Sequence, residues 1–195
     1  MAGPDERTPR MRVLPGSLIA VMALVGAPQV VVQTAISEPL RWVSDIEQFE
    51  AADRVHPPVP GSIVFAGSSS IAMWETLEKD FGYFPVLNRG ISGSMLADNV
   101  QSVYRIVLPY KPPVVVIYAG ENDLVEGETP ERVLHDYQTF TSTVHRKLPA
   151  TRVLFVSIKP SIARRSHLGK ISNTNRSEAS FNRAARRHAS DAVEP

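Results

Sequence analysis

The sequence predicts an α/β protein in which an open parallel sheet carries helices on both faces. Three apolar runs without polar alternation, Ile63–Ala66, Val114–Tyr118 and Val153–Ile158, are typical of strands that are buried on both faces. Apolar residues at helical spacing separate these runs, so the predicted order is β-α-β-α-β-α-β. In such sheets the working residues gather at the carboxyl ends of the strands.

The first 35 residues have the pattern of a secretory signal peptide. Arginines stand ahead of an apolar run, Leu18–Val32, and small residues follow it. Cleavage would follow Ala27 or Ala35, and the run is also long enough to remain as a membrane anchor. A buried core helix is disfavoured because glycine and proline interrupt the segment. We therefore expect an exported protein, periplasmic or secreted, with membrane contact through this segment if it is retained.

The following elements complete the predicted sheet and its helices. The proline-rich stretch His56–Gly61 cannot be helical, and a shorter strand, Tyr83–Asn88, fits between the first two apolar runs. Thr129 as N-cap and Pro130 at the first helical position mark the start of one helix. The expected helical stripes are Val43, Ile46 and Phe49; Ile71, Trp74, Leu77 and Phe81; Leu96, Val100, Val103 and Val107; and Val133, Tyr137, Phe140, Val144 and Leu148.

Length and composition exclude several classes of protein. The 195 residues suit a single domain, and the formal net charge of +1 indicates no general attraction to nucleic acid. The absence of cysteine excludes disulfides, thiolate metal sites and a cysteine nucleophile. The histidines are not spaced as metal ligands, and no Gly-x-Gly-x-x-Gly follows the first strand, which argues against nucleotide binding.

Three predicted strands end in polar turns that contain glycine. These turns contain Ser69, Gly93 and Asn122 in "GSSS", "NRGISGS" and "AGENDL". A serine esterase needs a hydroxyl nucleophile and N–H donors directed at the developing oxyanion, and these three residues supply both. The positive end of the helix after Ser69 would add to them. Each residue also has an ordinary explanation, as a helix N-cap, a turn glycine or an Asx-turn, but three such coincidences at successive strand ends are less probable together.

These blocks resemble the SGNH hydrolases, the GDSL-type esterases and lipases. The resemblance covers roughly residues 42–164 and rests on "IVFAGSSSIAMW", "VLNRGISGSMLADNV", "VVVIYAGENDL" and "LPATRVLFVSIKPSIAR". It implies that Ser69 is the nucleophile, with Ser68 where many members have aspartate, and that the Ser69 N–H, Gly93 and Asn122 form the oxyanion hole. It also implies a three-layer α/β/α sandwich around a parallel, flavodoxin-like sheet.

The family's Asp-x-x-His signature, which activates the serine, does not follow Ser69 in this sequence. It occurs once, at Asp53–His56, ahead of the first strand, and we interpret that match as chance. The general base is therefore unassigned. The other histidines are poor substitutes, because two lie within a predicted helix and two in a tail without a suitably placed aspartate: His135, His145, His167 and His188.

The C-terminal region changes character. We predict an incomplete hydrolase domain over residues 40–164 and an atypical polar, basic tail over 165–195, able to form a short exposed helix from Lys170 but no buried strand. A truncation or a shifted reading frame is our hypothesis for its origin. The family's last strand would then be missing, and Val153–Ile158 would form a bare edge that favours self-association.

The predicted function is hydrolysis of carboxylic esters on a small-molecule substrate, without a cofactor and without nucleic acid. The missing Asp/His pair predicts impaired turnover. The alternative is an inactive relative that binds an acyl or glycan ligand, or a truncated product without function. Nothing in the sequence identifies which ester is cleaved.

Overall fold

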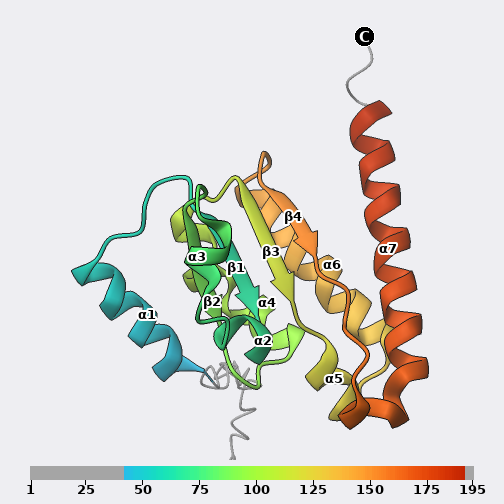
Figure 1. Cartoon of the computed structure of the whole chain (residues 1–195). Helices are drawn as coiled ribbons and strands as arrows, with labels where there is room; N and C mark the ends of the chain where they lie inside the picture. Colours follow the sequence, from blue (N-terminus) through green and yellow to red (C-terminus); the bar gives the residue numbers. More distant parts are fainter. Residues whose placement is uncertain (1–41, 192–195) are drawn as a thin grey trace, which may run out of the picture. The chain divides into compact units, whose positions relative to one another are not determined.

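The computed structural model describes residues 42–191, so the predicted signal peptide or anchor lies outside the described residues. Helices and strands alternate along this part of the chain (Figure 1). In order, they are α1 (Val43–Val55), β1 (Ile63–Gly67), α2 (Ser69–Ala72), α3 (Leu77–Phe81), β2 (Val86–Gly90), α4 (Leu96–Ile106), η1 (Leu108–Tyr110), β3 (Val114–Tyr118), α5 (Glu121–Val125), α6 (Pro130–Lys147), β4 (Arg152–Phe155), η2 (Ile162–His167) and α7 (Leu168–Asp191).

The strands form one parallel sheet in the order β2-β1-β3-β4. The three apolar runs and the shorter strand are all present, which confirms the predicted parallel α/β fold. The shorter strand begins at Val86, and the last one ends at Phe155. Val156 still donates its N–H to the Ile117 carbonyl (2.9 Å), but beyond it the backbone N–H of Ile158 bonds to the side chain of Asn175 instead. The last apolar run therefore leaves the sheet early.

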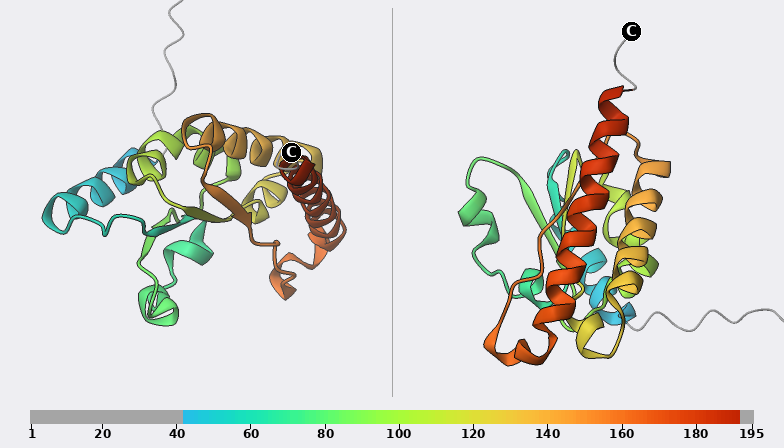
Figure 2. Two further views of the ribbon diagram at one scale, coloured as in Figure 1. Left: turned by 90° about the horizontal axis from the view of Figure 1, so that it is seen from above. Right: turned by 90° about the vertical axis from the view of Figure 1, so that its right-hand side faces the viewer.

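Helices cover both faces of the sheet, as Figure 2 shows from above. On one face, alternate residues of β1 and β3 pack against α1, α4 and α6: Val64, Ala66, Val115 and Ile117. On the other face, Phe65 and Tyr118 pack against Ile71 and Leu77 of the two short helices α2 and α3. This alternation explains why the strands are apolar without interruption.

The segment after Ser69 differs from the single helix that its apolar spacing predicts. It forms two short helices, α2 and α3, with a turn between them. In the turn, Trp74 Nε1 and Thr76 Oγ1 each donate to the Asp80 carboxylate at 2.7 Å. The Trp74 ring also packs edge-on against Phe65 and Phe81. Because α2 has only four residues, it cannot supply the helix dipole expected beside Ser69.

Helix α6 begins as the sequence predicts. The Thr129 hydroxyl accepts a hydrogen bond from the Arg132 N–H (3.2 Å), and Pro130 takes the first helical position. Its buried apolar stripe, Val133, Tyr137, Phe140 and Val144, faces the core.

Helix α1 is fastened by charged groups. The Asp53 carboxylate pairs with Arg89 of β2 and accepts a hydrogen bond from the Tyr110 hydroxyl (2.6 Å). The Arg89 guanidinium also lies 5.0 Å from the centre of the Phe49 ring. Asp53 is therefore fully engaged in holding α1 to the sheet, and His56 is exposed. This supports the interpretation of the Asp53–His56 match as chance.

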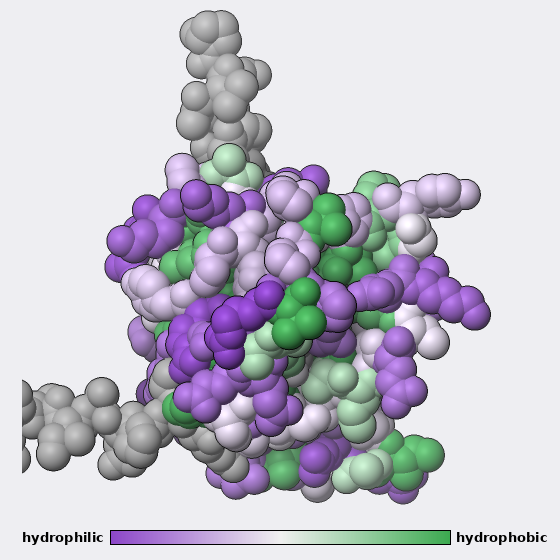
Figure 3. Space-filling model, turned by 90° about the vertical axis from the view of Figure 1, so that its left-hand side faces the viewer, coloured by the Kyte–Doolittle hydropathy of each residue, from purple (hydrophilic) through white to green (hydrophobic). Residues whose placement is uncertain are grey.

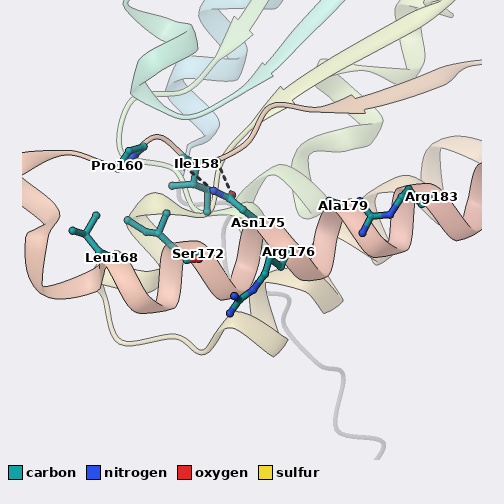
Figure 4. A pocket seen from close by; sticks show the side chains of 9 residues that line it. Ile158, Pro160, Leu168, Ser172, Asn175, Arg176, Ala179 and Arg183 are labelled. Atoms are coloured by element: carbon teal, nitrogen blue, oxygen red, sulfur yellow. Dashed lines mark hydrogen bonds between the residues drawn. The ribbon is translucent and has the colours of Figure 1, made fainter.

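Helix α7 occupies the region in which the sequence predicts a short exposed helix at most. It has 24 residues and packs beside α6 (Figure 2). Ile171 is buried, and the Phe181 ring meets Tyr137 of α6 edge-on at 5.7 Å. The Asn175 amide pairs with both the N–H and the carbonyl of Ile158, each at 2.9 Å, at one side of an open groove (Figure 4). The expectation of a short exposed helix was wrong, because these few contacts suffice to order a long one.

The surface on the α1 side is largely hydrophilic, with separate hydrophobic groups (Figure 3). Scattered apolar side chains of this kind need no partner. Within residues 42–191, no helix is long and apolar enough to cross a membrane.

Candidate active site

The first predicted site residue, Ser69, lies two residues after the end of β1 and is the first residue of α2. The preceding turn is tight: a Cβ on Gly67 (φ +132°) would lie 2.0 Å from the Tyr118 carbonyl oxygen, so only glycine fits there. The Ser68 N–H donates to that same carbonyl (2.9 Å), and Ser68 is buried. Ser69 is half-buried, and no residue of the described part forms a hydrogen bond with its hydroxyl. The hydroxyl is therefore available to a ligand.

Gly93 lies in the turn after β2, at the same edge of the sheet. Its φ of +81° is the left-handed conformation that favours glycine, and the residue is exposed. A Cβ at this position would lie 3.4 Å from the ring of Trp42. That distance is ordinary van der Waals contact, so the left-handed φ rather than a lack of space favours glycine here.

Asn122 lies in the turn after β3, at the second position of α5. Gly120, with φ +105°, precedes the helix as its N-cap. The Asn122 side-chain amide donates one N–H to the Ser94 carbonyl (3.0 Å). A side-chain amide has two N–H groups, so the second stays available.

Hydrogen bonds join the three turns to one another. The Ile91 N–H and the Ser94 hydroxyl both donate to the Gly67 carbonyl, at 2.8 and 3.2 Å, which joins the β2 turn to the β1 turn. The Ser68 bond joins the β1 turn to β3, and the Asn122 bond joins the β3 turn to the β2 turn. The structure thus brings the turns that carry Ser69, Gly93 and Asn122 together at the carboxyl edge of the sheet.

Comparison with known protein families identifies the group to which this fold and these turns belong. The family model of the GDSL-like lipases and acylhydrolases matches residues 61–194, more than half of the chain. The chain belongs to the GDSL-like lipase/acylhydrolase family.

Solved structures of GDSL-type proteins have the same fold. A GDSL-like lipase from Bacteroides thetaiotaomicron is 20% identical and has a TM-score of 0.63, covering 73% of this chain and 75% of that one. A candidate acylhydrolase from Bacteroides fragilis is 22% identical, with a TM-score of 0.54 and coverage of 76% and 74%. A candidate lipolytic protein of the G-D-S-L family from Desulfitobacterium hafniense is 15% identical, with a TM-score of 0.57 and coverage of 65% and 74%. None of the curated proteins matches the chain.

The described histidines of this GDSL-like chain are either hydrogen-bonded to other groups than Ser69 or exposed. The His145 ring bonds to the Thr151 carbonyl (3.1 Å), and the His167 ring bonds to the Ser166 hydroxyl (3.1 Å). His135 is exposed on α6. The side chain of His188 lies outside the part that is described. Within that part, no histidine is hydrogen-bonded to Ser69, and no group of three histidine or acidic side chains is arranged to hold a metal ion.

The segment after β4 adds a residue that the sequence analysis did not single out. Lys159 Nζ donates to the Ser70 hydroxyl (3.1 Å), and the ammonium lies 5.8 Å from the centre of the Tyr118 ring. The neighbouring Glu121 accepts a hydrogen bond from the Tyr118 hydroxyl (3.1 Å) and pairs with Arg164 (3.4 Å). Lys159 follows the fourth strand, so the rule that working residues gather at strand ends could have found it.

Two buried carboxyl groups lie behind the site. Asp123, next to Asn122, accepts a hydrogen bond from the Leu96 N–H (2.9 Å), and burial raises its pKa to about 6. Glu178 of α7 is only 1% exposed, and burial, together with the charge of Asp123, raises its pKa to about 9. Neither oxygen of Glu178 has a hydrogen-bond partner among the described residues. The Glu178 carboxyl is therefore protonated in the folded chain at neutral pH.

Proposed function

We propose that this chain is a serine hydrolase of carboxylic esters, in which Ser69 is the nucleophile. Ester hydrolysis is the activity of the family at its broadest level, and the residue roles are our proposal. The observation that carries it is the set of hydrogen bonds joining the turns of Ser69, Gly93 and Asn122. In this arrangement, one free hydroxyl lies at the same edge of the sheet as an exposed glycine turn and a side-chain amide.

The proposed reaction has two steps. The Ser69 Oγ attacks the ester carbonyl carbon, the alcohol leaves with a proton, and an acyl-enzyme forms. Water then attacks the acyl-enzyme, which releases the acid and restores the hydroxyl. In both steps the Ser69 and Gly93 N–H groups and the free N–H of Asn122 would stabilise the oxyanion.

The rate depends on a proton acceptor for Ser69. Asp-x-x-His occurs only at Asp53–His56, where Asp53 is committed to Arg89. We therefore propose slow turnover for this chain, sustained by oxyanion stabilisation and substrate positioning alone. Serine proteases that lack triad members retain a rate about 10³-fold or more above that in water, so slow hydrolysis of an activated ester fits the proposal. The same absence favours the second candidate, binding of an acyl or glycan ligand without turnover.

A fluorophosphonate probe tests the nucleophile. We expect slow labelling of Ser69 alone, located by mass spectrometry of the digested protein, because Ser69 carries the accessible hydroxyl beside the proposed oxyanion donors, and rapid labelling would reveal a base that activates it. Labelling at Ser68 or Ser70 would disprove the assignment. Complete absence of labelling, with retained binding of an acyl ligand, would favour the second candidate.

Asn122→Ala tests the oxyanion hole. Loss of one such donor lowers kcat by about 100-fold or more in other serine hydrolases, and we expect a decrease of that order in 4-nitrophenyl acetate hydrolysis. Asn173→Ala is the matched control, because Asn173 is exposed on α7. Equal rates for the two variants would remove Asn122 from the mechanism.

Export of the chain and its self-association complete the proposal. We propose that residues 1–35 direct export. Fractionation of a bacterial host that expresses the full chain would test this by the compartment in which the protein is found.

We also propose that the open edge of β4 favours self-association, since β4 pairs only with β3 within the described part. Analytical ultracentrifugation that finds only monomers would argue against it.

A further inference from the structure

Ser94 lies at the centre of the hydrogen bonds that join the three turns. It directly follows Gly93, precedes α4, and has no exposed surface. Its own N–H donates to the Ile91 carbonyl (3.1 Å), which closes the turn that carries Gly93. Ser94 is therefore fixed inside the protein, beside a residue that faces solvent.

The Ser94 hydroxyl reaches the strand that leads to the nucleophile. It donates to the Gly67 carbonyl (3.2 Å), two residues before Ser69, and accepts a hydrogen bond from Asn99 Nδ2 (3.1 Å). Asn99 is also fully buried, and its Nδ2 makes a second bond, to the Met95 carbonyl (2.8 Å). The hydroxyl is thus held by a donor and an acceptor from two different elements, which fixes its direction.

The Ser94 carbonyl reaches the third turn. It accepts the hydrogen bond from Asn122 Nδ2 (3.0 Å), the only hydrogen bond of that amide within the described part of the chain. This bond sets the rotation of the amide and thereby the direction of its second N–H. One buried residue therefore contacts the β1 turn through its hydroxyl and the β3 turn through its carbonyl, and adjoins Gly93 through the chain.

We infer that Ser94 is a positioning residue that sets Gly93 and Asn122 relative to Ser69. This inference rests on the proposed function, because it gives those three residues their roles. Oxyanion donors act at about 2.7–3.1 Å from the reacting oxygen. A misplacement of about 1 Å can cost a rate factor on the order of 100. The hydroxyl of Ser94 acts on the rate through this placement, without touching the substrate.

Ser94→Ala tests the inference, with 4-nitrophenyl acetate as substrate and the full chain as enzyme. Removing the hydroxyl takes away one of the two hydrogen bonds that the Gly67 carbonyl accepts and one of the two that Asn99 Nδ2 donates, so the turns can shift. We expect kcat to fall by about 10- to 100-fold while KM changes less than about threefold, since misplaced oxyanion donors affect the transition state more than the bound ester. The rate of fluorophosphonate labelling at Ser69 should fall by a similar factor.

Ser102→Ala is the matched control. Ser102 is 1% exposed and lies on α4, away from the turns, so this variant loses the same buried atom. We expect its kcat to equal that of the parent. Circular dichroism must show both variants folded at the assay temperature. If Ser94→Ala does not fold, Ser94→Cys keeps the shape with a weaker donor, and the same drop in kcat at unchanged KM is expected.

A double variant and the single variants together distinguish failure of this inference from failure of the proposed function. If Ser94 acts partly through the Asn122 amide, Ser94→Ala lowers kcat less in an Asn122→Ala background than in the parent. The inference alone is overturned if Asn122→Ala lowers kcat but Ser94→Ala does not, or if Ser94→Ala acts no differently from Ser102→Ala. If Ser69→Ala and Asn122→Ala both leave hydrolysis unchanged, the proposed function fails, and the inference fails with it.

Discussion

Helices α1 and α7 flank the same layer of helices, yet they bury charge in opposite ways. The Asp53 carboxylate of α1 has both an ionic partner, Arg89, and a hydroxyl donor, Tyr110. The Glu178 carboxyl of α7 is buried more deeply, and neither of its oxygens has a partner among the described residues. A buried carboxyl group therefore stabilises the packing of α1 and destabilises the packing of α7.

The difference shows what a buried carboxyl needs in order to stabilise a helix contact. Transfer of a polar group from water into a protein costs free energy unless a hydrogen bond replaces its water. α1 meets this condition, whereas α7 is held by Ile171, Phe181 and Asn175 against the cost of burying Glu178. Because Glu178 lies near Asp123, which adjoins Asn122, the packing of α7 also bears on the candidate site.

The largest effect is expected from breaking the buried pair that holds α1. Arg89→Met leaves the Asp53 carboxylate without its ionic partner in a region where Arg89 itself is 5% exposed. Removing one member of a buried ion pair typically costs about 3–5 kcal/mol. We expect a decrease of this size in the free energy of unfolding, measured by urea denaturation. A decrease below about 1 kcal/mol would mean that the pair does not fasten α1.

The next effect has the opposite sign and concerns α7. Glu178→Leu removes a desolvated carboxyl and replaces it with an apolar side chain, so we expect the free energy of unfolding to rise by about 1–3 kcal/mol at pH 7. Glu178→Gln is the matched control at the same position. It removes the ionisation but keeps a buried polar group, so its gain should be smaller. A loss of stability in Glu178→Leu would show that the carboxyl has a stabilising partner.

The centre of the sheet and its polar edge could be predicted from the sequence. Uninterrupted apolar runs define β1 and β3, and parallel strands place their carboxyl ends side by side, which predicted the placing of Ser69, Gly93 and Asn122 at one edge. Ser94 could not be predicted in the same way. Its importance depends on a carbonyl 27 residues away in the sequence, and a serine in a polar turn gives no sign of burial.

The C-terminal helix was harder to predict, because its buried face carries little apolar area. Ile171, Thr174, Glu178 and Phe181 follow one another at helical spacing and lie on the packed side of α7. Two of these four residues are polar, so the stripe looks like a solvated surface. The ten-residue interval between Ile171 and Phe181, close to three turns, was the available signal.

The pH dependence of stability tests the difference between the paired carboxylate of α1 and the carboxyl of α7, which is unpaired among the described residues. The Glu178 pKa is raised from 4.5 to about 9, and that of Asp123 from 3.8 to about 6. At a pH between the pKa of such a carboxyl in the unfolded chain and its pKa in the folded chain, the folded chain keeps a proton that the unfolded chain has lost. The free energy of unfolding therefore falls as the pH rises. For Glu178 the slope is at most about 1.4 kcal/mol per pH unit between pH 4.5 and 9.

Urea denaturation of the parent chain and of Glu178→Leu at pH 5, 7 and 8.5 measures this slope. We expect the decline above pH 6 to be present in the parent and largely absent in the variant, because Asp123 titrates mostly below that range. Parallel curves for the two proteins would assign the decline to other groups. A parent whose stability rises over this range would contradict the burial of a protonated Glu178.

The smallest effect is expected from the second ion pair of α1. Arg105 forms two hydrogen bonds with Glu50, at 2.7 and 2.8 Å, but the two side chains are 30% and 37% exposed. Water solvates both groups when the pair is broken, and exposed pairs typically contribute about 0.2–1 kcal/mol. We therefore expect Arg105→Met to lower the free energy of unfolding by no more than this, with a smaller difference from the parent in 0.5 M salt. Arg89→Met should keep most of its effect at the same salt concentration, because burial limits screening. If the two arginine variants lost equal stability, the burial of an ion pair would have no effect on how strongly it holds α1. The contrast with Glu178 would then need another cause.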